Sequence, residues 1–498
     1  MLTRPGRLLG VALAFWAAGS AGAQRPDLVA FGQRVEREAR DWRAPGLAIA
    51  VVKDDSVVFA KGYGVIELGK PTAVDVHTRF AIGSTTKAMT AAALAMLVDE
   101  GKLRWDDKVI DYIPELQLHD AYATRELTIR DLLTHRSGLA ATDLFWQVDE
   151  NTPSPAEQIR RLRYIRPASS FRSQFAYQNV MYTLNGTIIQ RVSGMPWDAF
   201  LRTRIFVPLG MSESEALVSG IVGKANVAVP HLAKGGQVHV IPVKSTDAVA
   251  SGGSVWSSVS DMAKWMRLVL DSGRVGTRRL ISPSSFRELV APQIRVPLSQ
   301  YPALRLSAPR AFSYGLGWFV QDYQGRGVLM HTGSIDGMSA LIGLLPEERV
   351  GVFVLANLDH LELRHALMYE VFDLYGRGPQ RDWSREVKAL FDSLSAQPAA
   401  ARPSGGSVKP SLPVERFAGT YLDSAYGAVT VTVANGTLRA QYDRLDMGAL
   451  EHWDFDTFRA RARKLLDDPP LLAFQSDGAG AVASVRLFGK VFVRNTRP

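Results

Sequence analysis

The sequence predicts an α/β (α+β) protein with two domains, and three observations lead to this class. Apolar, β-branched runs early and late in the large first region predict the strands of one antiparallel sheet flanked by helices. Between them, a 3.6-residue periodicity predicts a helical subdomain. A stretch rich in Ala, Pro, Gly and Ser then leads to a tail of alternating polar and apolar residues, which predicts a small C-terminal β-barrel-like domain.

The expected organisation is a signal peptide at 1–23, a large domain at 24–395, a linker at 396–413 and the C-terminal β domain at 414–498. Arg4 and Arg7, the apolar run 8–18 and the small residues Ala21-Gly22-Ala23 are typical of a cleaved secretory signal. The apolar run is short for a bilayer span, which disfavours the alternative of an uncleaved anchor. We therefore expect a periplasmic or secreted protein with no membrane span after cleavage.

Composition limits the function classes. A chain of 498 residues with 46% hydrophobic and 21% charged residues is too long for one ordinary domain and is typical of folded proteins. It contains no cysteine, which excludes disulfides, thiolate metal sites and a catalytic thiol. The net charge of +9 comes from scattered arginines, and the densest run, 160–166, is typical of a solvated helix face. No nucleic-acid partner is expected.

In chain order, the large domain begins with an amphipathic helix at 27–42 and a hairpin, 47–52 and 57–60, around Lys53-Asp54-Asp55. Strong helix formers from Thr86 to Gly101 predict a buried helix that is entered through the turn Gly83-Ser84. Further helices are expected at 127–138, 181–192, 197–206 and 260–270.

The later part of the chain returns to strands. Segments 328–332, 339–344 and 350–356 predict an antiparallel meander, and helices at 361–374 and 385–394 follow it. We expect His360 and His365 on the surface of a helix rather than at a metal ion. In the tail, Asn435-Gly436 lies between the alternating segments 428–433 and 437–442, which is a strong hairpin signal.

Ser84 and Lys87 are spaced as S-x-x-K at the start of the buried helix. Residues three apart share a helix face, so the hydroxyl and the amine can form a hydrogen bond. A lysine in an apolar place has a lowered pKa and can take the proton of a serine nucleophile. The spacing alone is weak evidence, because a serine that caps a helix followed by a solvated lysine gives the same pattern.

Two further polar clusters follow, Tyr177-Gln178-Asn179 and His331-Thr332-Gly333-Ser334. Taken separately, the first could be a helix cap with a packed aromatic ring and the second a strand-end histidine. In the order S-x-x-K, Y-x-N and H-T-G, the three motifs resemble the serine β-lactamase and penicillin-binding-protein superfamily, especially its class C-like, esterase and D-aminopeptidase branch. The tail, with Phe417-Ala418-Gly419-Thr420-Tyr421, is similar to a lipocalin-like accessory domain.

The resemblance implies a β-lactamase/transpeptidase-like fold and an exported serine hydrolase that acts through an acyl-enzyme on esters, amides or D-amino-acid peptides. Ser84 is then the nucleophile, and Lys87 and Tyr177 act together as the base. Substrate binding is assigned to a further set of residues: Asn179, His331, Thr332, Gly333 and Ser334. The backbone N–H groups of Ser84 and Ser334 form the oxyanion hole.

One position departs from the family pattern, because His331 stands where lysine is frequent. This weakens the expectation of antibiotic hydrolysis, and a class C-like β-lactamase or D,D-carboxypeptidase remains an alternative. So does a catalytically silent sensor that binds peptidoglycan or peptides. No cofactor and no metal are expected, because the chain has no G-x-S-x-G, H-E-x-x-H or phosphate-loop motif. The expected partner is a small ester, amide, β-lactam or peptidoglycan-derived peptide.

Overall fold

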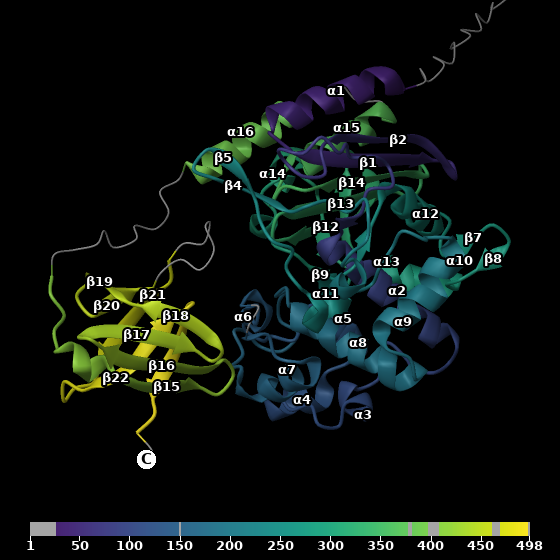
Figure 1. Ribbon diagram of the computed structural model, residues 1–498. Helices are drawn as coiled ribbons and strands as arrows, with labels where there is room; N and C mark the ends of the chain where they lie inside the picture. Colours follow the sequence, from purple (N-terminus) through teal and green to yellow (C-terminus); the bar gives the residue numbers. More distant parts are fainter. Residues whose placement is uncertain (1–25, 149–150, 377–380, 397–407, 461–468, 497–498) are drawn as a thin grey trace, which may run out of the picture.

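The computed structural model describes residues 26–148, 151–376, 381–396, 408–460 and 469–496 (Figure 1). The predicted signal peptide and most of the predicted linker lie outside these ranges. Within them, the large domain contains an eight-stranded antiparallel sheet in the order β2-β1-β14-β13-β12-β11-β10-β9. Its strands are β1 Gly46–Lys53, β2 Ser56–Gly64, β9 Ile294–Arg295, β10 Phe312–Tyr314, β11 Phe319–Tyr323, β12 Arg326–Ile335, β13 Met338–Leu345 and β14 Val350–Ala356. The predicted hairpin and meander are confirmed.

Strand β1 shows why the sheet is covered on both faces. Leu47, Ile49 and Val51 belong to one hydrophobic cluster, whereas the intervening Ala48, Ala50 and Val52 belong to another. Because successive side chains of a strand point to opposite faces, a run without polar residues needs helices on each side. The first cluster includes α1 Leu28–Asp41, α15 Leu363–Leu374 and α16 Trp383–Ser395. The second includes α2 Thr86–Asp99, α12 Val259–Leu270 and α13 Pro283–Val290.

The helical subdomain is inserted between β2 and β9, and it packs on α2 (Figure 1). Its helices are α3 Val109–Tyr112, α4 Ala121–Glu126, α5 Ile129–Leu133, α6 Leu144–Gln147, α7 Pro155–Arg161, α8 Asn179–Ser193, α9 Trp197–Leu201, α10 Val207–Leu209 and α11 Ala250–Gly253. The expected helix 127–138 is wrong at its end, because α5 stops at Leu133. Thr128 caps that helix together with Asp131, as a capping box.

Short elements complete the large domain. They are the strand pairs β3 Phe80–Ala81 with β6 Trp256–Ser257, β4 His231–Lys234 with β5 Gln237–Val240, and β7 Arg274–Val275 with β8 Arg278–Arg279, and the helix α14 Leu304–Ser307. The expectation for His365 is wrong: this side chain in α15 is buried and pairs with Glu362. In the part of the chain that the structure describes, no helix is long and apolar enough to cross a bilayer.

The C-terminal domain is a nine-stranded antiparallel sheet in the order β18-β17-β16-β15-β23-β22-β21-β20-β19. Its strands are β15 Gly419–Asp423, β16 Gly427–Ala434, β17 Thr437–Tyr442, β18 Leu445–Ala449, β19 Glu451–Asp454, β20 Thr457–Arg459, β21 Leu471–Ser476, β22 Val482–Leu487 and β23 Lys490–Arg494. The edge strands β18 and β19 follow one another with only Leu450 between them, so the sheet curls into a nearly closed barrel. Asn435 and Gly436 turn between β16 and β17 with positive φ, as predicted.

Candidate active site

Ser84 lies in a 3₁₀ turn, Gly83–Thr85, that leads directly into α2. The turn is pressed against β12: a Cβ on Gly83 would lie 2.7 Å from the backbone nitrogen of Ser334, and a Cβ on Gly333 would lie 3.0 Å from that of Ser84. Gly83 also has a φ of +51°. These two glycines therefore let the Ser84 turn and β12 approach so closely that their backbone amides lie side by side.

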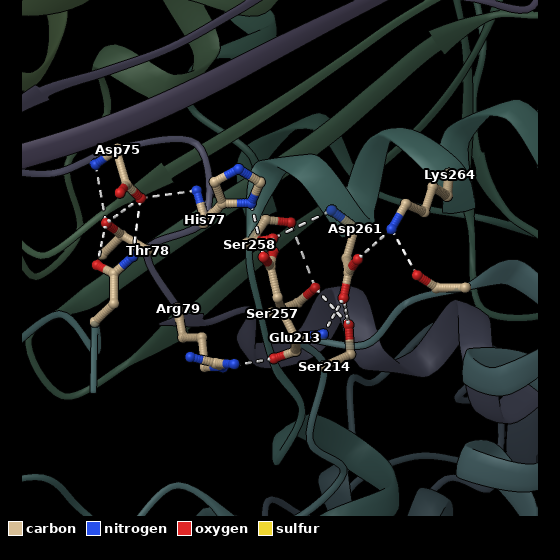
Figure 2. A network of polar contacts seen from close by, with 12 residues as sticks. Asp75, His77, Thr78, Arg79, Glu213, Ser214, Ser257, Ser258, Asp261 and Lys264 are labelled. Atoms are coloured by element: carbon tan, nitrogen blue, oxygen red, sulfur yellow. Dashed lines mark hydrogen bonds and ion pairs between the residues drawn. The ribbon is translucent and has the colours of Figure 1, made fainter. Parts of the chain in front are cut away.

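A polar network fixes the strands behind this turn (Figure 2). β3, which leads to Ser84, pairs with β6, and Ser257 at the end of β6 bonds to Ser214 at 2.8 Å. Asp261, in the first turn of α12, accepts from the backbone N–H of Glu213 at 2.7 Å and from the Ser214 hydroxyl at 3.0 Å. The network therefore ties the Glu213–Ser214 segment to the end of β6 and to the first turn of α12, next to the strand that leads to Ser84.

Lys87 is buried in α2, and its Nζ has three close partners. It lies 3.1 Å from Ser84 Oγ, 2.7 Å from Asn179 Oδ1 and 2.7 Å from the carbonyl oxygen of Gly252 in α11. Burial lowers the pKa of Lys87 to about 7, and the Asp143 carboxylate acts in the opposite direction. The predicted contact between Ser84 and Lys87 is thus present, and a substantial fraction of the Lys87 amine is neutral near pH 7.

Tyr177, just before α8, and Asn179, the first residue of α8, approach the same point. The Lys87 Nζ lies 4.7 Å from the centre of the Tyr177 ring. Burial raises the pKa of Tyr177 well above its usual range, and the neighbouring Ser84 hydroxyl acts against this rise. The Tyr177 hydroxyl is buried and forms no hydrogen bond of good geometry with the described residues. It is therefore a neutral phenol whose proton is not committed to a structural partner.

His331 lies within β12, and both of its ring nitrogens are used. Nδ1 lies 2.6 Å from the Thr332 carbonyl oxygen, which can only accept, so Nδ1 carries the proton. Nε2 then accepts from the Tyr314 hydroxyl at 2.9 Å. Burial, followed by the nearby Lys87, lowers the pKa of His331 to about 3. Its imidazole is neutral and presents no cation to the cleft.

All the residues singled out from the sequence except Lys87 and Gly333 line one cleft of about 500 Å³. The lining also includes residues that the sequence did not indicate: Asp143, Trp146, Gln147, Phe175, Tyr301, Phe319, Asp336, Asp359 and His360. Gly333 lies behind the cleft, where its carbonyl accepts from Arg364 at 2.7 Å, and the same guanidinium donates to Ser334 Oγ at 2.9 Å. The lining is mixed: the rings of Trp146, Phe175 and Phe319 lie among mostly polar side chains, which suits a small organic substrate that carries polar groups.

Asp143 was missed because it looks like an ordinary helix-capping residue in front of α6. Its Oδ1 instead accepts from Asn179 Nδ2 and from Trp146 Nε1, each at 3.1 Å. Arg364, in the first turn of α15, was also missed, although a charge in a largely apolar helix indicates a buried ionic partner. That partner is Glu362, at 3.0 Å, and both side chains are almost fully buried.

Comparison with known proteins identifies the class. Residues 31–374 match the model of the Beta-lactamase family, and the chain belongs to this family. It is a serine hydrolase of the β-lactamase and penicillin-binding-protein superfamily, and the predicted resemblance and fold are confirmed. Residues 405–496 match DUF3471, a domain of unknown function.

Particular relatives are distant. The chain is 28% identical over 466 residues to the unguisins hydrolase ungD of Aspergillus violaceofuscus (strain CBS 115571), which covers 86% of this chain and 82% of the relative. It is 28% identical over 330 residues to penicillin-binding protein 4 of Amycolatopsis lactamdurans, covering 65% and 84%. The solved structure of the octameric penicillin-binding protein homologue from Pyrococcus abyssi has a TM-score of 0.63 at 22% identity, covering 94% of this chain and all of that one, and supports the fold.

Proposed function

We propose that this protein is an exported hydrolase that forms an acyl-enzyme on Ser84 and acts on esters, amides or D-amino-acid peptides. The observation that carries the proposal is the set of partners around Lys87 Nζ. Two of them, Asn179 Oδ1 and the Gly252 carbonyl oxygen, can only accept hydrogen bonds. A neutral amine has two N–H groups, which these acceptors use, so its lone pair is left for the proton of Ser84.

The acylation step follows from this arrangement. Ser84 Oγ attacks the substrate carbonyl carbon while its proton passes to Lys87 Nζ, and the carbonyl oxygen becomes an oxyanion. The backbone N–H groups of Ser84 and Ser334, brought together across Gly83 and Gly333, are placed to stabilise that oxyanion. The tetrahedral intermediate then collapses and expels the alkoxide or amine.

Tyr177 supplies the proton path to the leaving group. Its pKa is raised, so the phenol remains protonated and can pass its proton to the departing oxygen or nitrogen while it recovers one from Lys87. Water then attacks the acyl-enzyme, with Lys87 again as the base, and the acid is released. In this scheme Lys87 is the base and Tyr177 a relay, which refines the expectation that the two act together.

The substrate preference rests on β12. A β-lactam carries a carboxylate. The imidazole of His331 is neutral and uses both ring nitrogens in hydrogen bonds, so it offers that carboxylate no positive charge. Short acyl esters and amides carry no carboxylate, and a small D-amino-acid peptide carries it at its C-terminus, away from an N-terminal scissile bond. We therefore expect them to be hydrolysed faster than penicillins or cephalosporins, with a class C-like β-lactamase as the alternative outcome.

A covalent label tests the nucleophile. The purified protein is treated with a fluorophosphonate, digested and analysed by mass spectrometry, and the mass gain is expected on the peptide that contains Ser84. Ser84→Ala should lose both label and turnover, whereas Ser173→Ala, at an exposed serine, should keep both. A label elsewhere, or an active Ser84→Ala, would refute the assignment. A protein that takes no label and turns nothing over would support the silent sensor.

A substrate panel tests the preference. Nitrophenyl butyrate, D-alanyl peptides and a chromogenic cephalosporin are compared by kcat/KM on the same preparation, with Ser84→Ala as the blank. Efficient turnover of the cephalosporin with negligible esterase and peptidase activity would reverse the ranking.

A further inference from the structure

The C-terminal domain contacts the large domain along one short stretch, next to α6 and α7 (Figure 1). Tyr426, in the loop between β15 and β16, donates its hydroxyl to the carbonyl oxygen of Ala141 at 3.2 Å. Lys490 in β23 donates to the same oxygen, also at 3.2 Å, and its Nζ lies 4.6 Å from the centre of the Tyr426 ring. The Tyr426 ring packs on Phe145, with ring centres 5.3 Å apart.

Two further residues of the large domain, Asn151 and Arg161, extend this interface. The Asn151 amide donates to the Tyr442 carbonyl at 2.6 Å and accepts from the backbone N–H of Arg444 at 2.9 Å. Arg161 in α7 donates to the Ala425 carbonyl at 3.2 Å. Phe145 and Tyr426 are both nearly fully buried and belong to one hydrophobic cluster that runs through the two domains. The interface between the two domains therefore includes buried, packed side chains and is more than a contact between exposed loops.

The 141–147 segment that receives these contacts also forms a wall of the active-site cleft. Asp143, Trp146 and Gln147 line the cleft beside Ser84 and Tyr177. Asp143 holds Asn179, whose Oδ1 accepts from Lys87. The segment thus has one side against the C-terminal domain and the other against the groups that surround the nucleophile.

We propose that the C-terminal domain positions the active site: through Tyr426 and Lys490 it fixes the 141–147 segment, and thereby Asp143 and Asn179 beside Lys87. This gives the domain of unknown function a task in catalysis that needs no substrate contact of its own. Tyr426 and Lys490 are positioning residues. The segment has three internal backbone hydrogen bonds and only the one-turn helix α6, so anchors from outside it also decide where its side chains lie.

The electrostatics around Lys87 supply a readout that a purely structural contact would not change. The titratable neighbours on the elements packed around it are Asp143, His135, Tyr177, Tyr182 and His331. Burial lowers the pKa values of both histidines and raises those of both tyrosines, so all four are neutral near pH 7. Asp143 is the neighbour that raises the pKa of Lys87, and a displaced Asp143 therefore lowers it.

The test uses the full chain with the double variant Y426F/K490M, which removes both donors to Ala141 and keeps the bulk of the side chains. The matched control is Y421F/K409M. Tyr421 donates to the Phe417 carbonyl inside the same domain at 2.7 Å, and Lys409 is exposed. We expect the interface variant to lose about five- to tenfold in kcat/KM, the scale of one or two hydrogen bonds. The acidic limb of its profile of kcat/KM against pH should shift to lower pH, because the pKa of Lys87 falls. The control should retain the wild-type kcat/KM and the wild-type position of the acidic limb.

A double-mutant cycle with Asp143→Asn separates positioning from general damage. If the C-terminal domain acts through Asp143, Y426F/K490M should move the acidic limb little further in the D143N background. Additive shifts, or equal losses in interface variant and control, would overturn the proposal.

Hydrogen exchange gives an outcome that does not depend on catalysis. Because the role of Lys87 rests on the proposed function, amide exchange is followed in the peptide spanning 139–148, which should exchange faster in Y426F/K490M than in wild type and control. Failure of Ser84 labelling would count against the proposed function alone. Unchanged exchange in that peptide would refute the positioning role whatever the substrate.

Discussion

The acidic limb of the pH–rate profile should report Lys87. Its pKa falls from an ordinary 10.5 to about 7 because the buried amine loses water. At about 1.4 kcal/mol per pH unit, charging this amine in place is disfavoured by about 5 kcal/mol relative to water. The proposed mechanism needs the neutral form, so kcat/KM should be half-maximal near pH 7 and fall about tenfold for each unit below it.

The assay is the hydrolysis of nitrophenyl butyrate between pH 5 and 9 at constant ionic strength. His331 cannot produce a limb near neutrality, because its pKa is about 3. His360 lines the cleft and has a pKa raised by its hydrogen bond to Asp359, so His360→Gln is the control and should leave the midpoint in place. A flat profile down to pH 5, a midpoint near 10, or a midpoint that moves with His360→Gln would refute the reasoning.

Three other substitutions test the site and its support. Tyr177→Phe should lower kcat/KM by about two to four orders of magnitude without a change in Tm, because its hydroxyl has no structural partner among the described residues. Gly333→Ala should lower kcat/KM by about 100-fold or more and also lower Tm, because the new Cβ would lie 2.0 Å from the Ile82 carbonyl oxygen. Glu38→Gln should stabilise the protein at pH 8–9. Burial, and then Glu370, raises the pKa of Glu38 in the folded protein. The wild type therefore loses stability as pH rises from 4.5 through the folded pKa, by up to about 1.4 kcal/mol per pH unit for one proton.

Each of these has a direct check. Near-full activity of Tyr177→Phe on every substrate would remove the relay. Gly327→Ala lies on the same strand with open space around its Cβ and serves as the control for Gly333→Ala; equal losses would show that the close approach does not matter. Urea unfolding at pH 6 and pH 9 tests Glu38→Gln, and the same pH dependence in variant and wild type would refute it.

The sequence predicted the sheet, the buried helix after Ser84 and the three motifs, because each depends on local patterns. β1 and β14 have continuous apolar runs, and α2 is built from strong helix formers with Gly101 just beyond it. The contact between Ser84 and Lys87 followed from residues three apart on one helical stretch. Periodicity and spacing are sufficient for such features.

What the sequence could not predict arises from contacts between distant segments. Asp143 reaches Asn179 only because the 141–147 segment folds back beside α8, and nothing in its own neighbourhood indicates this. The neutral state of His331 depends on burial and on the Tyr314 hydroxyl, which come from other segments of the chain. His365 lies in a helix whose residues 363–373 are all buried although several of them are ionisable, which a helical pattern alone does not distinguish from a surface helix.

The order of strands in the C-terminal sheet determines when that sheet can be completed during synthesis. β23, at Lys490–Arg494, lies between β15 and β22 rather than at an edge, and it carries Lys490. While a chain is being synthesised, the earlier strands can pair among themselves, but the sheet stays split until residue 494 has emerged. A nascent chain that already has Ser84, Lys87 and Tyr177 would therefore still have a loose cleft wall. If the C-terminal domain positions the cleft wall as proposed, full hydrolytic activity requires a chain that extends through β23.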